Sequence, residues 1–463
     1  MRPAITAVLE RAKQRLRQEL RLPRYAIAIV VILLIAFDLR IQSVLHTDMG
    51  TRVRDDAREY VQYAYNLKYF GVYSRSDTLS DDAVPAPTPD AKRVPLYPLF
   101  IAPFMSQPLL HSDFDTVVRV QAVLSTITVL LVFWLARLIL PIPLALTAAA
   151  LTALSPHLVT MNIYVLSETL CCFMLVLAMY LTAKIAGPTT ARTPLLAGIV
   201  LAGAALTHPM ALFFVIPLAI FLLLTWGWKN GHRKLALLAL GFNLVYGPWM
   251  VRNVATLGAA GDSTLSLAAL RSGVYRNLMY NDDPQTFAYP YRFDPSYETT
   301  SKDLPSVAAE VIRNFKDAPL EQLQWYLVGK PTLLWSWTNA EGRGKYDIFI
   351  YPVRQSPYDY LPQFRASKGF MQFTHSGWVV LMLVGIIVAW LPAAWSGLSS
   401  ASLFAARAIA LLLLYHAAVM IAGFPFPRYS IPMRPFLYIM AMLPLAVGVK
   451  WLIAKRWIRL GVS

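Results

Sequence analysis

The chain has 463 residues, of which 57% are hydrophobic and only 15% are charged. Soluble domains carry about 45–50% apolar and about 25% charged residues, so this composition argues against a soluble enzyme and indicates many membrane spans. The net charge of +16 is compatible with a nucleic-acid partner or with a membrane protein whose cytoplasmic loops are basic. Two cysteines, Cys171 and Cys172, are adjacent in an apolar run and predict neither a disulfide framework nor a zinc site.

The chain begins with a basic segment, residues 1–24, and an apolar stretch follows at once. No small-residue exit site precedes the acidic segment beyond it, so we interpret this stretch as a retained membrane helix rather than a cleavable signal peptide. Ten apolar runs are candidate spans: 25–45, 117–140, 144–160, 166–184, 195–209, 211–227, 235–255, 376–392, 403–423 and 436–454. The stretch 195–227 is also compatible with one bent hairpin.

The positions of lysine and arginine orient these spans, because short loops rich in the two residues stay in the cytoplasm. With the N-terminus inside, seventeen basic and two acidic residues fall in the N-terminal segment, the inner loops and the C-terminal tail. The rest of the chain is then nearly neutral. This asymmetry supports the ten-span count and predicts a multi-pass protein of the inner (plasma) membrane. It also explains the positive charge without nucleic acid.

Two long connections then lie on the extracytoplasmic side, at 46–116 and 256–375. The predicted organisation is a transmembrane module (25–255) that contains the first loop, an extracytoplasmic loop domain (256–375) and C-terminal transmembrane helices (376–463). Residues 306–335 carry apolar side chains at helical spacing, which predicts amphipathic helices on the membrane surface. The expected fold class is therefore an all-α integral membrane protein with extracytoplasmic helices and loops.

Five polar clusters fall at the extracytoplasmic ends of the predicted spans. They are Asp55 and Asp56, "KRVPLYP" (92–98), "YVLSETL" (164–170) with Glu168, "GPWMVRNVATLG" (247–258) with Arg252, and "FPFPRYSIPMRP" (424–435) with Arg428 and Tyr429. Polar residues gather in loops for simple solvation, and that is the plainer interpretation of any one cluster. The convergence of all five on one face predicts a site at the outer membrane surface.

The first cluster and the layout together resemble the GT-C glycosyltransferases, integral membrane enzymes that include the aminoarabinose transferases of lipid A and the protein O-mannosyltransferases. In that superfamily an acidic residue in the first outer loop is followed by tyrosine four positions later and then by a small-residue turn. Here Asp56 is followed by Tyr60 and Gly71 in "DAREYVQYAYNLKYFG". Many members have glutamate directly after the aspartate. This chain has Ala57 there, so that second carboxylate is missing, and Asp55 is the expected partial replacement.

The resemblance implies a GT-C-type bundle of about ten transmembrane helices and an inverting transfer of sugar from a polyprenyl-phosphate carrier. "RVPLYP" is similar to a basic-Pro-Leu motif whose basic residue contacts the carrier phosphate, which places Arg93 on the phosphate. Asp56 is the expected catalytic base, with Asp55 in support or in solvent. The alternative role for Asp56 is a helix N-cap.

The remaining candidates keep two or more interpretations each. Arg93, Arg252 and Arg428 bind the donor phosphate or form structural pairs, and Arg252 and Arg428 are also candidates to anchor helix ends at the headgroup level. Glu168, at a membrane boundary, pairs with an arginine, binds a metal or contacts the acceptor. Tyr60 and Tyr429 are candidate substrate-binding residues, and an interfacial aromatic belt is the alternative for the tyrosines of the first loop.

No cofactor is certain from the sequence. The seven histidines lack metal-ligand spacing and predict no protein-only metal site, while a divalent cation held by an aspartate and the donor phosphate stays open. The predicted partners are the polyprenyl-phosphate sugar donor, an acceptor that is a lipid, a glycan or a protein, and the membrane. Competing functions are a lipid-linked glycan transporter or flippase, which would place charged or broken-helix sites near mid-membrane, and a glycan polymerase or ligase.

Overall fold

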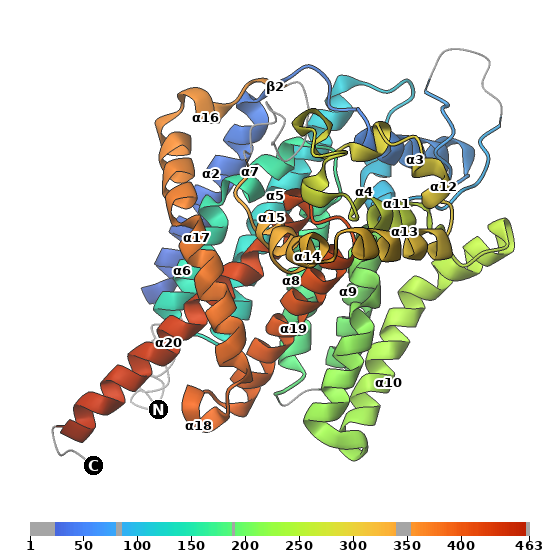
Figure 1. Ribbon diagram of the computed structural model, residues 1–463. Coiled ribbons are helices and arrows are strands. Elements are labelled where there is room, and N and C mark those ends of the chain that lie inside the picture. The colour runs from blue at the N-terminus through green and yellow to red at the C-terminus, as the bar shows by residue number, and fades with distance from the viewer. Residues whose placement is uncertain (1–23, 80–85, 188–189, 339–352, 460–463) are drawn as a thin grey trace, which may run out of the picture.

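The computed structural model describes residues 24–79, 86–187, 190–338 and 353–459, and helices dominate these ranges (Figure 1). Apart from Arg24, the predicted basic N-terminal segment lies outside the described residues. The first part of the chain contains α2 (Arg24–His46), β1 (Asp48–Met49), α3 (Asp56–Phe70), α4 (Leu96–Ile101), η1 (Ala102–Phe104), α5 (His111–Arg137), α6 (Ile142–Leu154), α7 (Pro156–Thr160), η2 (Met161–Ile163), α8 (Glu168–Lys184), α9 (Arg192–Thr207), η3 (Pro209–Phe214) and α10 (Val215–Leu257).

The second part begins with short helices and ends with long ones. The short ones are α11 (Thr264–Ser272), η4 (Arg276–Leu278), η5 (Pro284–Thr286), η6 (Pro290–Arg292), α12 (Tyr297–Thr300), α13 (Leu304–Asp317), α14 (Pro319–Gln324), η7 (Trp325–Gly329), α15 (Lys330–Leu334) and, after β2 (Val353–Gln355), α16 (Pro357–Tyr360). They are followed by α17 (Pro362–Trp390), α18 (Ala393–Ser396), α19 (Ser400–Ala422), η8 (Pro427–Met433) and α20 (Arg434–Arg459).

The predicted all-α membrane fold is confirmed, and fewer single helices than predicted runs are long enough to span, partly because α10 contains two of the runs. Six helices of the described residues are long and apolar enough to cross a membrane, or seven if the bent pair α6–α7 counts as one span. Each of the ten apolar runs coincides with helical structure. However, α8 and α9, with 17 and 16 residues, are shorter than the roughly 20 residues that cross a hydrocarbon core.

One long helix, α10, is a hairpin of two limbs. Gly227 has φ 68° and ψ 168°, a conformation that breaks the helical path and that glycine adopts without steric cost. A Cβ on Gly231 would lie 3.5 Å from the carbonyl oxygen of Leu222, whereas residues nine apart in a straight helix are separated by about 13.5 Å. The chain therefore reverses at Gly227, which agrees with the separate apolar runs predicted on either side of it.

Glycines let the long helices pack closely. A Cβ on Gly241 of α10 would lie 2.1 Å from the carbonyl oxygen of Leu195 in α9, and one on Gly198 of α9 would lie 2.0 Å from that of Leu238. Small residues at such contacts allow helix backbones to approach in a membrane, where packing replaces the hydrophobic drive for association. The α9–α10 contact therefore depends on these glycines.

The two long connections meet at one end of the bundle. Figure 1 shows α3 and α4 at the same end as α11 to α14 and α16. β1 and β2 tie the connections together as an antiparallel pair in which Asp48 lies opposite Gln355. The helices expected within 306–335 are present as α13, α14, η7 and α15. α17 starts at Pro362, well before the predicted span at 376, because its polar first turns continue the same helix beyond the apolar part.

Candidate active site

Asp56 and Asp55 stand at the start of α3, where their side chains have different surroundings. Asp56 is the first residue of the helix, and Asp55 before it has a φ of 46° and makes no side-chain cap. The side chain of Asp55 is 58% exposed, and Nε of Arg54 lies 3.4 Å from its Oδ2. Asp56 is 28% exposed and belongs to a different set of contacts. The structure thus separates the two adjacent carboxylates.

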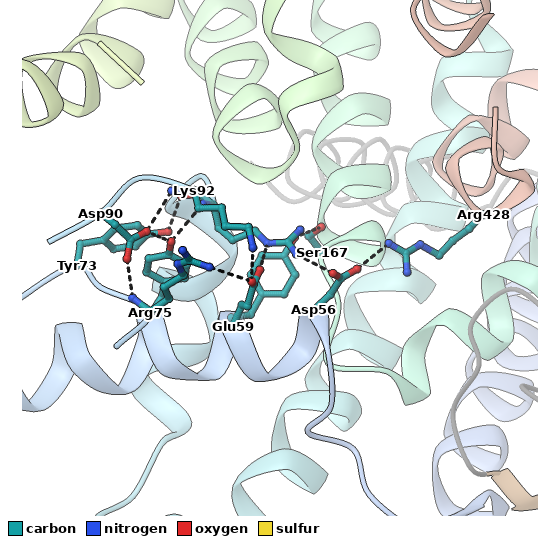
Figure 2. A network of polar contacts seen from close by, with 11 residues as sticks. Asp56, Glu59, Tyr73, Arg75, Asp90, Lys92, Ser167 and Arg428 are labelled. Carbon is teal, nitrogen blue, oxygen red and sulfur yellow. Dashed lines mark hydrogen bonds and ion pairs between the residues drawn. The ribbon is translucent and has the colours of Figure 1, made fainter. Parts of the chain in front are cut away.

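Asp56 lies between two arginines that come from distant parts of the chain. Nη2 of Arg93, in the segment before α4, donates to Oδ1 of Asp56 at 2.6 Å. Nη2 of Arg428, in η8, donates to Oδ2 at 3.0 Å (Figure 2). The carboxylate therefore has a guanidinium on each side. Of the three arginines selected from the sequence, Arg93 and Arg428 contact Asp56.

Glu59 supplies a second carboxylate one helical turn after Asp56. Residues three apart lie on the same face of a helix. Oε2 of Glu59 accepts from Nε of Arg93 at 2.6 Å, and Oε1 accepts from Nζ of Lys92 at 2.6 Å, with Arg75 at 3.7 Å (Figure 2). Glu59, and not Asp55, is the second carboxylate in contact with Arg93.

Sequence reasoning missed both Glu59 and Lys92, although two signals were present. The spacing of Glu59 from Asp56 places both carboxylates on one helix face. Lys92 directly precedes Arg93 in the basic motif, and a lysine beside an expected phosphate ligand is itself a candidate cation.

Glu168 and two tyrosines complete the cluster. Glu168, at the start of α8 and only 3% exposed, lies 3.0 Å from Nε of Arg428, so pairing with an arginine is the interpretation that the geometry matches. The hydroxyl of Tyr60 lies 3.1 Å from Oγ of Ser167, and the guanidinium of Arg93 lies over the Tyr60 ring at 5.3 Å. The ring of Tyr429 is 5.5 Å from the Arg428 guanidinium.

Arg252 does not join this cluster. Its guanidinium donates to the backbone carbonyls of Tyr73 at 3.0 Å and Asp90 at 2.8 Å, and it lies over the rings of Tyr73 and Trp249. These contacts fasten the first connection to the end of α10. The geometry thus matches the anchoring interpretation of Arg252.

The carboxylates of α3 are held in their charged form. Burial would raise the pKa of Asp56, but the charges of Arg93 and Arg428 and the hydrogen bonds from them outweigh it and hold that pKa well below its usual range. For Glu59, burial likewise acts upward, and Arg93 and Lys92 lower the pKa below its ordinary value. Burial raises the pKa of Tyr60 to about 12, so its phenol stays neutral.

The charges of the cluster leave a small positive surplus. Three carboxylates, Asp56, Glu59 and Glu168, face four cations, which are Arg75, Lys92, Arg93 and Arg428. A surplus of one positive charge, largely on arginine forks, suits a monoanion with several oxygens such as a phosphodiester. In the part of the chain that the structure describes, no three His, Cys, Asp or Glu side chains are placed to hold a metal ion.

Comparison with known proteins places this cluster in a known fold. A family model described as dolichyl-phosphate-mannose-protein mannosyltransferase matches residues 92–251, which begin at Lys92 of the cluster. No curated protein sequence matches the chain. The apo oligosaccharyltransferase of Archaeoglobus fulgidus aligns with a TM-score of 0.51 and 14% identity, over 95% of this chain and 52% of that one. The chain has the GT-C fold.

Two further structures are similar to this chain. The oligosaccharyltransferase AglB of the same archaeon, in complex with an inhibitory peptide and a dolichol-phosphate, aligns with a TM-score of 0.50 and 16% identity, over 95% of this chain and 52% of that one. ArnT of Cupriavidus metallidurans, bound to undecaprenyl phosphate, aligns with a TM-score of 0.39 and 14% identity, over 86% of this chain and 77% of that one. The chain spans about half the length of the archaeal enzymes it matches. The resemblance noted in the sequence is confirmed at the level of the fold.

Proposed function

We propose that the chain is an inverting glycosyltransferase that moves a sugar from a polyprenyl-phosphate carrier to an acceptor at the extracytoplasmic face of the inner membrane. The acceptor is a lipid, a glycan or a protein. The observation that carries this proposal is the position of Asp56 between Arg93 and Arg428, at one end of a GT-C fold. A carboxylate beside two cationic forks provides a base next to a phosphate-binding group, which are the two parts such a transfer needs.

The proposed reaction is a single displacement. A hydroxyl or amine of the acceptor attacks the anomeric carbon, the bond from that carbon to the phosphate oxygen breaks, and its electron pair stays on the phosphate. The acceptor's proton goes to the carboxylate of Asp56. The phosphodiester becomes a phosphomonoester with one more negative charge, and protonation of Asp56 removes one negative charge, so the net charge of the site is unchanged.

Donor binding also prepares the base in this mechanism. Arg93 and Arg428 hold Asp56 in a strongly ionised and therefore weakly basic state. When a donor binds, its phosphate oxygens accept some of the hydrogen bonds that Arg93 and Arg428 otherwise donate to Asp56. The pKa of Asp56 then rises, because the phosphate charge offsets the charges of the two arginines and the phosphate takes over some of their hydrogen bonds, and these charges and hydrogen bonds are what lower that pKa. The carboxylate becomes an effective base only when a donor is present.

A comparison of adjacent aspartates tests the function. The purified chain in lipid nanodiscs is supplied with polyprenyl-phosphate sugars and candidate acceptors, and the products are identified by mass. Asp56→Asn should reduce the rate of transfer by about 100-fold or more, as removal of a general base does. Asp55→Asn removes a charge one position earlier and should leave the rate unchanged. Full activity of a folded Asp56→Asn variant would exclude Asp56 as the base.

The orientation has its own test. The seventeen basic residues that fall on one side support an extracytoplasmic position of the cluster. A Thr300→Cys variant carries its new thiol on α12, while the two native cysteines are buried. A membrane-impermeant thiol reagent should label intact cells. Labelling only after lysis would invert the orientation.

A further inference from the structure

A cavity of about 330 Å³ lies among the short helices between α10 and α17. Its walls come from the end of α11, the turns after it, and α13 with α14, and they include Tyr275, Tyr280, Asn281, Arg313 and Asn314. Its lining shares no residue with the Asp56 cluster. The volume is at the lower end of the range of about 300–1,000 Å³ that small-molecule sites occupy.

The charged side chains of this cavity neutralise one another. Three arginines and three acidic residues line it. Their ion pairs are Arg271 with Asp294 at 2.6 Å and with Glu310 at 3.5 Å, Arg276 with Asp282 at 3.1 Å, and Arg313 with Glu310 at 2.7 Å. An ion entering the cavity would gain no net attraction and would have to displace a partner from one of these pairs. The ligand that fits is therefore uncharged and polar.

The remaining lining suits hydroxyl groups and sugar rings. The Asn281 side-chain amide supplies a donor and an acceptor side by side, and the buried side-chain oxygen of Gln322 has no hydrogen-bond partner among the described residues. The amide nitrogen of Asn314 donates to Glu310, and its side-chain oxygen adds an acceptor to the lining. These groups match the hydroxyls of a sugar. The rings of Tyr275 and Tyr280 meet edge to face at 6.3 Å, and aromatic rings offer the apolar surface on which the C–H face of a sugar packs. Planar amides beside aromatic rings indicate a saccharide.

The wall of the cavity has an unusual backbone. Asn277, Leu278, Asn281 and Asp282 have φ angles from +51° to +56°. Asparagine and aspartate enter this region at low cost, but leucine does so rarely. Leu278 is fully buried, in a cluster with Phe287, Ala288 and Trp325, and this packing holds the turn in place. Backbone that is held in sparsely populated conformations by its surroundings is a feature of ligand-binding sites.

The same packing joins the cavity to the Asp56 cluster. Phe424 and Phe426, just before Arg428, pack against the group of Leu278 and Trp325. The Trp325 indole N–H donates to the Gly273 carbonyl at 3.1 Å. The backbone of Gly273 in turn approaches Gly423 so closely that a Cβ would lie 1.9 Å from the Gly423 oxygen. The wall of the cavity and the segment that positions Arg428 therefore form one packed unit.

We propose that this cavity binds an uncharged saccharide part of the acceptor and thereby selects a glycan or a glycolipid as the acceptor class. That the bound saccharide is an acceptor rests on the proposed function. Its binding to the cavity requires neither a donor nor turnover. A saccharide held here is anchored to the unit that positions Arg428.

Saturation-transfer NMR tests the proposal on the full chain in nanodiscs without donor. The probes are neutral disaccharides (maltose, cellobiose, chitobiose and mannobiose), and inorganic phosphate competes as the charged alternative. At least one disaccharide should show saturation transfer that phosphate does not displace. Asn314→Leu and Tyr280→Leu should each reduce that signal by about tenfold. Lys316→Ala, which removes an exposed side chain from the same helix α13, should leave it unchanged.

Two results would overturn the proposal. One is the absence of saturation transfer from every disaccharide to a folded wild-type chain. The other is an equal signal in the wild type and in both cavity variants, which would place the saccharide elsewhere. Binding that follows the prediction in a chain that transfers no sugar would refute the proposed function and leave the saccharide site standing.

Discussion

Glu59 holds Arg93 through an ion pair in which Nε of Arg93 lies 2.6 Å from Oε2 of Glu59. The other side of the same guanidinium reaches Asp56. Arg93 is therefore positioned by one carboxylate and paired with the other. Because its five N–H groups form a rigid fork, fixing one edge of the guanidinium also fixes the direction of the rest. Glu59 thereby orients the group that we propose to meet the donor phosphate.

Replacement of Glu59 should weaken donor use more than it slows chemistry. In Glu59→Ala, Arg93 and Lys92 lose a shared partner, and kcat/KM for the donor should fall by about 30-fold, the equivalent of about 2 kcal/mol. Most of the loss should appear in the KM for the donor, since Glu59 acts through Arg93. Asp77→Ala is the control, because Asp77 pairs with Arg58 on the exposed side of the same helix. Equal kinetics for the two variants would remove the positioning role.

The Glu168–Arg428 pair should contribute to stability as well as to function. Glu168→Leu leaves Arg428 with one carboxylate fewer in a buried setting, which should lower the free energy of unfolding by about 3 kcal/mol. The double variant Glu168→Leu/Arg428→Met removes both charges and should be more stable than the single variant. A thiol-reactive dye that reports exposure of buried Cys171 and Cys172 measures the melting temperature. A double variant less stable than the single one would contradict this account.

The buried amine of Lys330 should make stability depend on pH. Lys330 is fully buried in α15, donates to the carbonyls of Ile421 at 2.7 Å and Gly423 at 3.2 Å, and burial lowers its pKa to about 7. The unfolded chain, with an ordinary lysine pKa of about 10.4, then binds more protons than the native chain between about pH 7 and pH 10. The contribution of Lys330 to stability is therefore least favourable below pH 7 and improves as the pH rises through this window.

Melting temperatures at pH 6 and pH 9 measure this dependence. Relative to Lys330→Met, which has no amine to titrate, the wild type should gain about 3 °C or more at pH 9 compared with pH 6. Lys316→Met, at an exposed lysine, should follow the wild type. Parallel curves for the wild type and Lys330→Met would show that the amine does not titrate in this range.

Two glycines of α10 should respond differently to alanine. A Cβ on Gly241 would lie 2.1 Å from the Leu195 carbonyl oxygen, whereas one on Gly247 meets nothing within 4 Å. Gly241→Ala should separate α9 from α10 and lower the melting temperature by several degrees. Gly247→Ala should raise it or leave it unchanged, since alanine favours the helix by about 1 kcal/mol over glycine. The dye assay described for Glu168 measures both, and similar shifts would refute the close α9–α10 contact.

The sequence predicted the membrane class and the key residue of the cluster because both have local signals. Apolar runs mark the helices, and the spacing from Asp56 to Tyr60 lies within one helix turn. The contact between Asp56 and Arg428 crosses 372 positions of the chain, so no periodicity reports it. Arg252 and Arg428 had the same sequence context, an arginine at the end of an apolar run. Only the three-dimensional arrangement shows that Arg428 pairs with carboxylates and that Arg252 donates to backbone carbonyls.

The number of full-length spans was harder to predict for a physical reason. Apolar content alone does not distinguish a helix that crosses the bilayer from a shorter helix packed inside protein, and α8 is largely buried among its neighbours. The choice between a supporting and a solvent-exposed Asp55 was likewise left open by the sequence. It depends on the positive φ of Asp55, which only the folded loop imposes.

Competition between Asp56 and the donor phosphate for Arg93 and Arg428 is the central claim, and the affinity of the chain for undecaprenyl phosphate tests it most directly. Measured in nanodiscs at constant salt, Arg93→Gln should bind this lipid at least about tenfold more weakly than the wild type, which corresponds to about 1.4 kcal/mol. Asp56→Asn should bind it more tightly, since the competing charge is gone. Weaker binding by Asp56→Asn, or unchanged binding by Arg93→Gln, would contradict the account.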